Sequence, residues 1–280
     1  MLLCILSLFM LVPAFVDWFY GSENWPAFVG SSISTLFVGL ILFFSNKGSA
    51  TEHLELRQAF LLTNSAWISI ALFGSLPFLL SNIEMSFIDA FFESTSGITT
   101  TGATVIENLE AKSHGILIWR ALLQWLGGVG IIVMALAVLP MLSIGGMQLF
   151  KTESYETPDK VVPKAASFAA GISIVYITLT VIWALMLWGA GMPMFDSIAH
   201  AMTTLATGGY STKSESLAAF NSSTIEIIII FGMLVGSLPF VHYLTLSKNG
   251  LKNLIKDDQV KLFLTFVFFV VLIMSLYLSS

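Results

Sequence analysis

The sequence predicts an all-α membrane protein in which a span, a re-entrant loop and a second span recur in parallel after two additional helices at the amino end. Composition is the first reason: 56% of the 280 residues are hydrophobic and 10% are charged, whereas about 25% of a soluble domain is charged. Apolar runs long enough to cross roughly 30 Å of hydrocarbon are the second reason. A spacing of 107 residues between recurring polar markers is the third.

The apolar runs define the expected elements. The predicted spans are residues 2–20, 26–44, 57–80, 116–142, 164–190, 224–246 and 261–279. Two shorter segments, 86–104 and 195–212, start as helices and become rich in Thr and Gly, so we expect them to enter and leave the membrane on one side. The predicted division is 1–50 (two amino-terminal transmembrane helices), 51–150 (first repeat), 151–250 (second repeat) and 251–280 (first helix of a third repeat).

Basic residues in the short loops predict the orientation of the spans. Nine of the twelve Lys and Arg residues fall on one face, which is therefore predicted to be cytoplasmic: Lys47, Arg57, Lys151, Lys160, Lys164, Lys248, Lys252, Lys256 and Lys261. Acidic residues gather on the opposite face: Asp17, Glu23, Glu84, Glu107, Glu110, Glu215 and Glu226. Both re-entrant segments are then expected on the outer side, beside these carboxylates.

The repeat is visible as matched residue pairs. Three pairs are each separated by 107 positions: Arg57 and Lys164, Asp89 and Asp196, and Gly102 and Gly209. Gly128 and Gly236 continue the match with one extra residue in the second unit. Because both units run in the same direction, the predicted repeat is parallel, about an axis along the membrane normal.

The Gly-rich end of each re-entrant segment predicts a cation site. Non-helical backbone at membrane depth needs partners for its carbonyl groups, and a dehydrated cation is such a partner in a selectivity filter. We expect short helices at about 87–98 and 195–205 to lead into the filter. The carbonyls predicted to coordinate ions belong to Thr100, Thr101, Gly102, Ala103, Thr207, Gly208, Gly209 and Tyr210. The alternative for either segment alone is a packing patch of small residues.

Polar residues near these segments are expected to support them. Asp89 and Asp196 start the two short helices, where each either caps the helix or attracts cations. Glu93 and His200 occupy equivalent repeat positions, and we expect hydrogen bonds from them rather than metal ligation. Arg120 lies within a span, so it either tunes the mouth of a pore or has a structural role, in which it snorkels to the interface or pairs with an acidic side chain.

Several other classes of function lack support in the sequence. No nucleophile–base pair, phosphate-binding glycine loop or metal cluster is recognisable, so we predict neither an enzyme nor a bound cofactor. The formal net charge of −5 argues against a nucleic-acid partner. The single cysteine, Cys4, has no partner for an internal disulfide and is interpreted as apolar filler.

Four stretches resemble the TrkH family of potassium transporters. They are Phe91–Thr104, Trp119–Ile131, Leu139–Phe150 and Ala206–Thr212. The resemblance implies four span–pore loop–span repeats folded like a tetrameric potassium channel, preceded by two extra spans. It also implies potassium uptake across the bacterial cytoplasmic membrane, a homodimer surrounded by lipid, and a cytoplasmic TrkA-type nucleotide-binding regulator. The filter glycines of the family correspond to Gly102 and Gly209.

The sequence departs from that family because it supplies two of the four repeats, and 261–279 resembles the first span of a third. A lone half cannot encircle an ion, so we expect a fragment rather than an assembly of two copies. Two alternative functions stay open at this point. One is a secondary cation symporter with broken helices at the midplane, and the other is a membrane fragment that does not transport.

Overall fold

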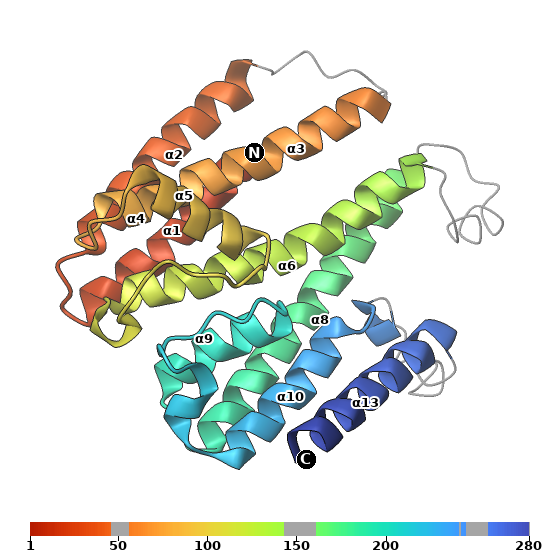
Figure 1. Ribbon diagram of the computed structural model, residues 1–280. Coiled ribbons are helices and arrows are strands. Elements are labelled where there is room, and N and C mark those ends of the chain that lie inside the picture. Colours follow the sequence, from red (N-terminus) through yellow and green to blue (C-terminus); the bar gives the residue numbers. More distant parts are fainter. Residues whose placement is uncertain (46–55, 143–160, 241, 245–256, 280) are drawn as a thin grey trace.

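The computed structural model describes residues 1–45, 56–142, 161–240, 242–244 and 257–279, and in these ranges every regular element is a helix (Figure 1). The elements are α1 (Leu2–Phe19), α2 (Trp25–Ser45), α3 (Leu56–Gly74), α4 (Leu76–Leu80), α5 (Phe87–Ile98), η1 (Leu109–Ala111), α6 (His114–Leu142), α8 (Val161–Gly189), α9 (Met194–Leu205), η3 (Ser216–Phe220), α10 (Ser223–Ser237) and α13 (Asp258–Ser279). The all-α prediction is therefore confirmed. The basic loop residues Lys47, Lys151, Lys160, Lys248, Lys252 and Lys256 lie outside the described ranges.

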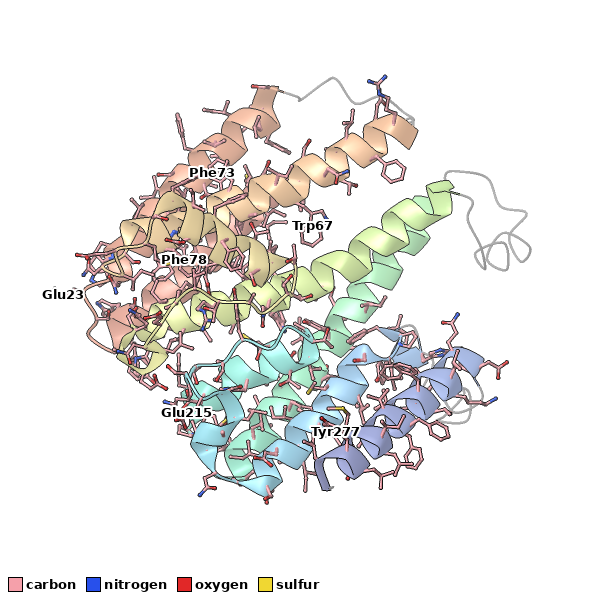
Figure 2. All side chains as sticks on the ribbon, in the orientation of Figure 1. Glu23, Trp67, Phe73, Phe78, Glu215 and Tyr277 are labelled. Carbon is pink, nitrogen blue, oxygen red and sulfur yellow. The ribbon has the colours of Figure 1, made fainter. Side chains whose placement is uncertain are left out.

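Five described helices are long and apolar enough to cross a membrane by length and composition: Leu2–Phe19, Trp25–Ser45, Phe60–Leu80, Ala169–Gly189 and Asp258–Leu278. Their outward sides carry large exposed apolar side chains, such as Phe37 and Tyr277. Glu23 and Glu215, both predicted on the outer face, lie toward the same end of the molecule (Figure 2). These features are those of a multi-pass membrane protein.

The predicted span 57–80 is confirmed as one apolar span, Phe60–Leu80, but its helix is interrupted at Ser75, between α3 and α4. Pro77 has no backbone N–H, and its ring would clash with a carbonyl one turn earlier in a continuous helix. The break frees the carbonyl of Gly74, which accepts a hydrogen bond from the Trp119 indole nitrogen at 3.0 Å. The break is therefore compensated by the neighbouring helix α6.

The predicted span 224–246 is also interrupted. Helix α10 ends at Ser237, and Leu238 is extended with φ −81° and ψ 149°. The cause is Pro239, because proline disfavours helical angles in the residue before it. Phe240 and residues 242–244 are helical again.

The two amino-terminal helices are attached to the first repeat by a buried carboxylate. Asp17 of α1 is 0% exposed and accepts hydrogen bonds from the Gly115 N–H at 2.6 Å and the Ser113 hydroxyl at 3.0 Å. Both donors lie at the start of α6, where helix N–H groups lack partners within the helix. Asp17, a residue of α1, thus caps the amino-terminal end of α6.

The apolar interior forms two clusters. One surrounds Trp119 and Phe28 and joins α1 and α2 to the first repeat. The other surrounds Tyr176 and Leu205 within the second repeat. Figure 1 shows the corresponding arrangement, with α6 and α8 running side by side between the two halves.

The register of the repeat changes after the two filter segments. A Cβ on Gly127 would collide with the Ile98 carbonyl, and a Cβ on Gly236 would lie 2.8 Å from the Leu205 carbonyl. Because Ile98 and Leu205 are 107 apart, Gly127 is the equivalent of Gly236, at an offset of 109 (236 minus 127). The predicted match of Gly128 with one inserted residue is therefore wrong. The two extra residues lie in η3, which has five residues where η1 has three.

Candidate functional site

Each short helix ends at its predicted position and is followed by an irregular backbone. Helices α5 and α9 end at Ile98 and Leu205, 107 residues apart. Thr100 and Gly102 have φ of 55° and 81°, and the equivalent Thr207 and Gly209 have φ of 52° and 83°. The residue between each pair has negative φ. In both segments the backbone therefore alternates between left-handed and right-handed φ values at equivalent residues. Glycine occupies the last left-handed position, where its lack of a Cβ avoids strain.

Backbone hydrogen bonds repeat at the same offset. The Thr101 N–H donates to the Ser96 carbonyl, and the Gly208 N–H donates to the Thr203 carbonyl, each at 2.9 Å. In a planar trans peptide the carbonyl points opposite to the N–H. The carbonyls of Thr100 and Thr207 are consequently directed away from their own short helices.

Six of the eight carbonyls predicted to bind ions have no protein partner among the described residues: those of Thr100, Thr101, Gly102, Thr207, Gly209 and Tyr210. Unpaired carbonyls at membrane depth cost several kcal/mol each unless something else binds them. These six are therefore the carbonyls available for a cation.

The remaining two carbonyls are already occupied by protein donors. The Ala103 oxygen accepts from the Ser96 hydroxyl at 2.6 Å and the Tyr210 hydroxyl at 3.2 Å. The Gly208 oxygen accepts from the Gln124 side-chain amide at 2.8 Å. Through these hydrogen bonds the carbonyls of Ala103 and Gly208 hold the two segments in place.

Glu93 supports the first segment from α5. Its carboxylate is fully buried and accepts from the Thr104 hydroxyl at 2.9 Å and the Val105 N–H at 3.1 Å. Arg120 donates to the same carboxylate at 2.7 Å. Arg120 therefore pairs with an acidic side chain, as one of its two interpretations predicted, and each buried charge compensates the other.

His200 supports the second segment from the equivalent position on α9. Its Nδ1 lies 2.8 Å from the Asp196 carbonyl and its Nε2 lies 3.0 Å from the Ser211 hydroxyl. A carbonyl can only accept, so Nδ1 carries a proton. The Ser211 oxygen accepts the Lys213 N–H, which leaves its own proton for Nε2. These partners favour the neutral tautomer protonated on Nδ1.

The two aspartates play different parts. The N-cap of α5 is Ser86, whose hydroxyl oxygen accepts the Asp89 N–H at 3.2 Å and donates to the Asp89 carboxylate at 2.7 Å. Asp89 therefore completes the cap from the first turn, three residues beyond the cap position. Asp196 accepts from the Thr212 hydroxyl at 2.6 Å and lies 3.8 Å from the Lys213 ammonium.

The two segments are joined to each other by side chains of both repeats. The Tyr210 hydroxyl donates to the Glu93 carbonyl at 2.9 Å and to the Ala103 carbonyl. The Arg120 guanidinium lies 4.1 Å from the centre of the Tyr210 ring and donates to the Ser211 carbonyl at 2.9 Å. A Cβ on Gly102 would collide with the Gly208 carbonyl, so the backbones themselves touch.

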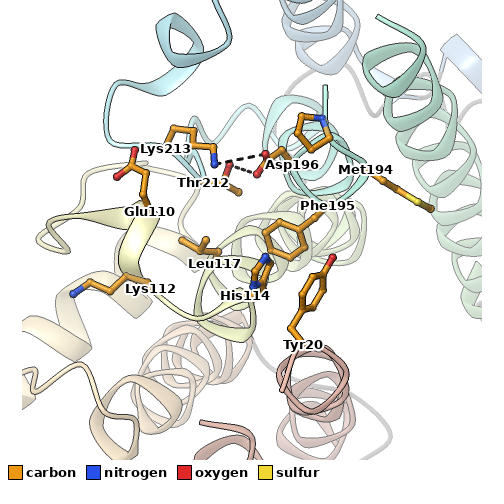
Figure 3. Close-up of a pocket in the computed structure, with 11 residues that line it drawn as sticks. Tyr20, Glu110, Lys112, His114, Leu117, Met194, Phe195, Asp196, Thr212 and Lys213 are labelled. Carbon is orange, nitrogen blue, oxygen red and sulfur yellow. Dashed lines mark hydrogen bonds and ion pairs between the residues drawn. The ribbon is translucent and has the colours of Figure 1, made fainter. Parts of the chain in front are cut away.

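A cavity of about 270 Å³ lies on the side of this junction that is predicted to face outward (Figure 3). Its walls come from the end of α1, the start of α6, the start of α9 and the loop after the second filter segment. Tyr20 stacks on His114 with ring centres 3.8 Å apart, and Phe195 packs on the edge of both rings. Tyrosine is enriched at the membrane–water interface.

Glu110 connects the outer loops of the two repeats beside this cavity. Its carboxylate accepts from the Ser214 hydroxyl at 2.6 Å and the Ser214 N–H at 2.7 Å. These hydrogen bonds, the hydroxyl first, lower the pKa of Glu110 to about 2. The carboxylate is therefore ionised at every physiological pH.

Sequence reasoning missed Gln124 and the side chain of Tyr210. Gln124 is fully buried and contacts the second segment from α6. A signal was present, because Gln124 follows Arg120 by four positions and so shares its helix face.

Comparisons with known proteins identify the family of this chain. A family model described as "TrkH: Cation transport protein" matches residues 25–279. The Trk system potassium uptake protein TrkH of Salmonella typhimurium is 39% identical over 96% of this chain and 56% of its own length. The Trk system potassium uptake protein TrkI of Halomonas elongata is 36% identical over 99% of this chain and 56% of its own length.

A solved structure is similar as well. The crystal structure of the potassium transporter TrkH from Vibrio parahaemolyticus superposes with a TM-score of 0.84 at 37% identity. The match covers 94% of this chain and 54% of that one. The chain thus spans about half of the length of the relatives it matches.

Proposed function

The chain belongs to the TrkH family of cation transport proteins, and on that premise we propose that it supplies two of the pore units of a bacterial potassium-uptake protein. Potassium is the transported ion in this proposal. The observation that carries it is the set of six carbonyls without protein partners, held by two segments with the same backbone conformation.

Ion passage requires that these carbonyls replace the water around the ion. The Thr100 and Thr207 oxygens are directed away from the helices behind them, and Gly102 and Gly209 permit the left-handed turn that follows. Glu93 and His200 hold the outer part of each segment through Thr104 and Ser211. The acidic outer face would raise the local cation concentration in a salt-dependent way.

The assembly is proposed along with the function. Two pore units would surround only part of an ion. Further repeats therefore complete the ring of carbonyls around it, in keeping with the greater length of the relatives. A homodimer in the bacterial cytoplasmic membrane with a TrkA-type regulator is the arrangement we propose. The parallel direction of α5 and α9 in their repeats disfavours an inverted-repeat symporter.

The test replaces each filter glycine by serine in the protein as its gene encodes it, in a bacterium lacking other potassium uptake. A serine at φ near +80° is strained by about 1–3 kcal/mol, so Gly102→Ser and Gly209→Ser should lose discrimination between potassium and sodium. Rubidium uptake against sodium competition measures this. Gly30→Ser is the matched control, since a Cβ there meets nothing within 4 Å. An unchanged ion ratio in both filter variants would refute the proposal.

A further inference from the structure

Two buried polar side chains of helix α6, in the first repeat, contact the filter segment of the second repeat. Arg120 and Gln124 are 1% and 0% exposed, and both lie on the face of α6 that meets Tyr210. Arg120 is neutralised by Glu93. Gln124 has no charge to compensate, and all of its described hydrogen bonds go to the filter backbone.

The Gln124 amide holds the peptide groups on both sides of Gly209. Its nitrogen donates to the Gly208 carbonyl at 2.8 Å, and its oxygen accepts the Tyr210 N–H at 3.1 Å. The Tyr210 N–H and the Gly209 carbonyl belong to one peptide unit, in which they point in opposite directions. By drawing the N–H toward α6, Gln124 therefore turns the Gly209 carbonyl away from α6. That carbonyl is one of the six without a protein partner.

The neighbouring sequence is adapted to this side chain. A Cβ on Gly208 would collide with the Gln124 amide, whereas the equivalent position in the first segment is Thr101. The second segment thus has glycine where the amide needs room. Gly208 has negative φ, so its backbone conformation does not itself require glycine.

The second repeat has no such side chain on its own helix. At the offset of 109, the residues of α10 that correspond to Arg120 and Gln124 are Ile229 and Met233. Both side chains are apolar, so α10 has no polar group at these two positions that could form a hydrogen bond with another segment. Among the described residues of the two repeats, the first repeat alone therefore has this arrangement, at its junction with the second.

We propose that Gln124 is a positioning residue that aims the Gly209 carbonyl at the permeating ion and so contributes to the choice of potassium over sodium. The inference rests on the proposed function, because it assigns the orientation of one filter carbonyl to a side chain outside the filter. It acts through Gly208 and Tyr210 and makes no contact with the ion itself.

The experiment compares Gln124→Met with Thr180→Val in the protein as its gene encodes it. Methionine keeps the length of glutamine and makes neither hydrogen bond. Thr180→Val removes a partly buried hydrogen bond of the same region, which the Trp125 indole donates to the Thr180 hydroxyl at 3.0 Å, without touching the filter. Rubidium uptake, its competition by sodium, and the melting temperature of the purified protein are measured for each.

We expect Gln124→Met to lower the potassium-to-sodium ratio at least about fivefold, the size of effect that one buried hydrogen bond gives, while total cation flux persists. Thr180→Val should lower the melting temperature and leave the ratio unchanged. Gly208→Ala should reproduce the lower ratio, since its Cβ displaces the amide with Gln124 still present. It also carries the test if Gln124→Met fails to fold.

A ratio unchanged in both Gln124→Met and Gly208→Ala would overturn the inference, as would an equal loss in Thr180→Val. The proposed function is judged separately by Gly102→Ser and Gly209→Ser. If those two variants lose selectivity and neither Gln124→Met nor Gly208→Ala does, the positioning role fails and the filter assignment stands. If none of them changes selectivity, the filter assignment itself fails.

Discussion

The two repeats share a backbone and differ in the chemistry that supports it. Thr100 and Thr207 have φ within a few degrees of each other, and the amide hydrogen bonds behind them are equal in length. Behind the first segment stands a buried ion pair, Glu93 and Arg120. Behind the second stands an imidazole, His200, bonded to a carbonyl and a hydroxyl.

The difference shows which part of the site is constrained. The carbonyls must lie where an ion needs them, so the backbone angles recur. The support has only to accept one hydroxyl hydrogen in each repeat, from Thr104 to Glu93 and from Ser211 to His200. A carboxylate and a neutral imidazole nitrogen can both do this. The carboxylate, however, brings a buried charge that needs Arg120.

The largest expected effect comes from breaking that charge pair. Arg120→Met leaves the Glu93 carboxylate buried without its cation, and such a loss costs about 3–5 kcal/mol. We expect a strong fall in folded protein and in melting temperature, measured by size-exclusion chromatography and thermal unfolding in detergent. Adding Glu93→Gln should recover part of the loss.

Lys213→Met is the matched control in the second repeat. Lys213 is one-third exposed and lies 3.8 Å from Asp196, so removing this pair should cost less than about 1 kcal/mol. Equal losses in Arg120→Met and Lys213→Met would show that the buried charge does not distinguish the repeats.

The next effect tests the corrected register of the repeats. Gly127→Ala should destabilise by about 1–3 kcal/mol, as overpacking does, because its Cβ collides with the Ile98 carbonyl. Gly236→Ala should cost less, since its Cβ lies 2.8 Å from the Leu205 carbonyl. The melting temperatures of the two variants are compared with that of Gly30→Ala, the control in which the added Cβ meets open space. A variant at either position that is as stable as the Gly30→Ala control would contradict the equivalence of Gly127 and Gly236.

The smallest effect concerns the exposed link between the repeats. The pKa of Glu110 is lowered from 4.5 to about 2, so its contribution to stability is complete above pH 4.5 and disappears as the pH falls toward 2. The melting temperatures of the parent protein and Glu110→Gln should differ by a small constant amount between pH 5 and 8. The difference should shrink below pH 4.5, and a difference that grows on acidification would exclude this assignment.

The sequence predicted the elements whose pattern is local. The bounds of α5 were anticipated at 87–98, because its helix-forming residues give way sharply to Thr and Gly. The break at Gly74 was missed, since hydropathy runs evenly across Pro77 and the compensating Trp119 lies 45 residues away. Gln124 was missed for a similar reason. Its two backbone partners are 84 and 86 residues distant, so its place four residues after Arg120 indicates a shared helix face without identifying what that face contacts.

The carboxylate of Asp17 has a consequence for how the chain is made. Its partner on α6, Gly115, is synthesised 98 residues later, which at 5–20 residues per second is a delay of about 5–20 s. During translation, α1 therefore enters the membrane with an acidic side chain whose final donors have not yet left the ribosome. The amino-terminal helices must remain beside the nascent first repeat until α6 arrives, so folding of this half is ordered by the sequence of synthesis.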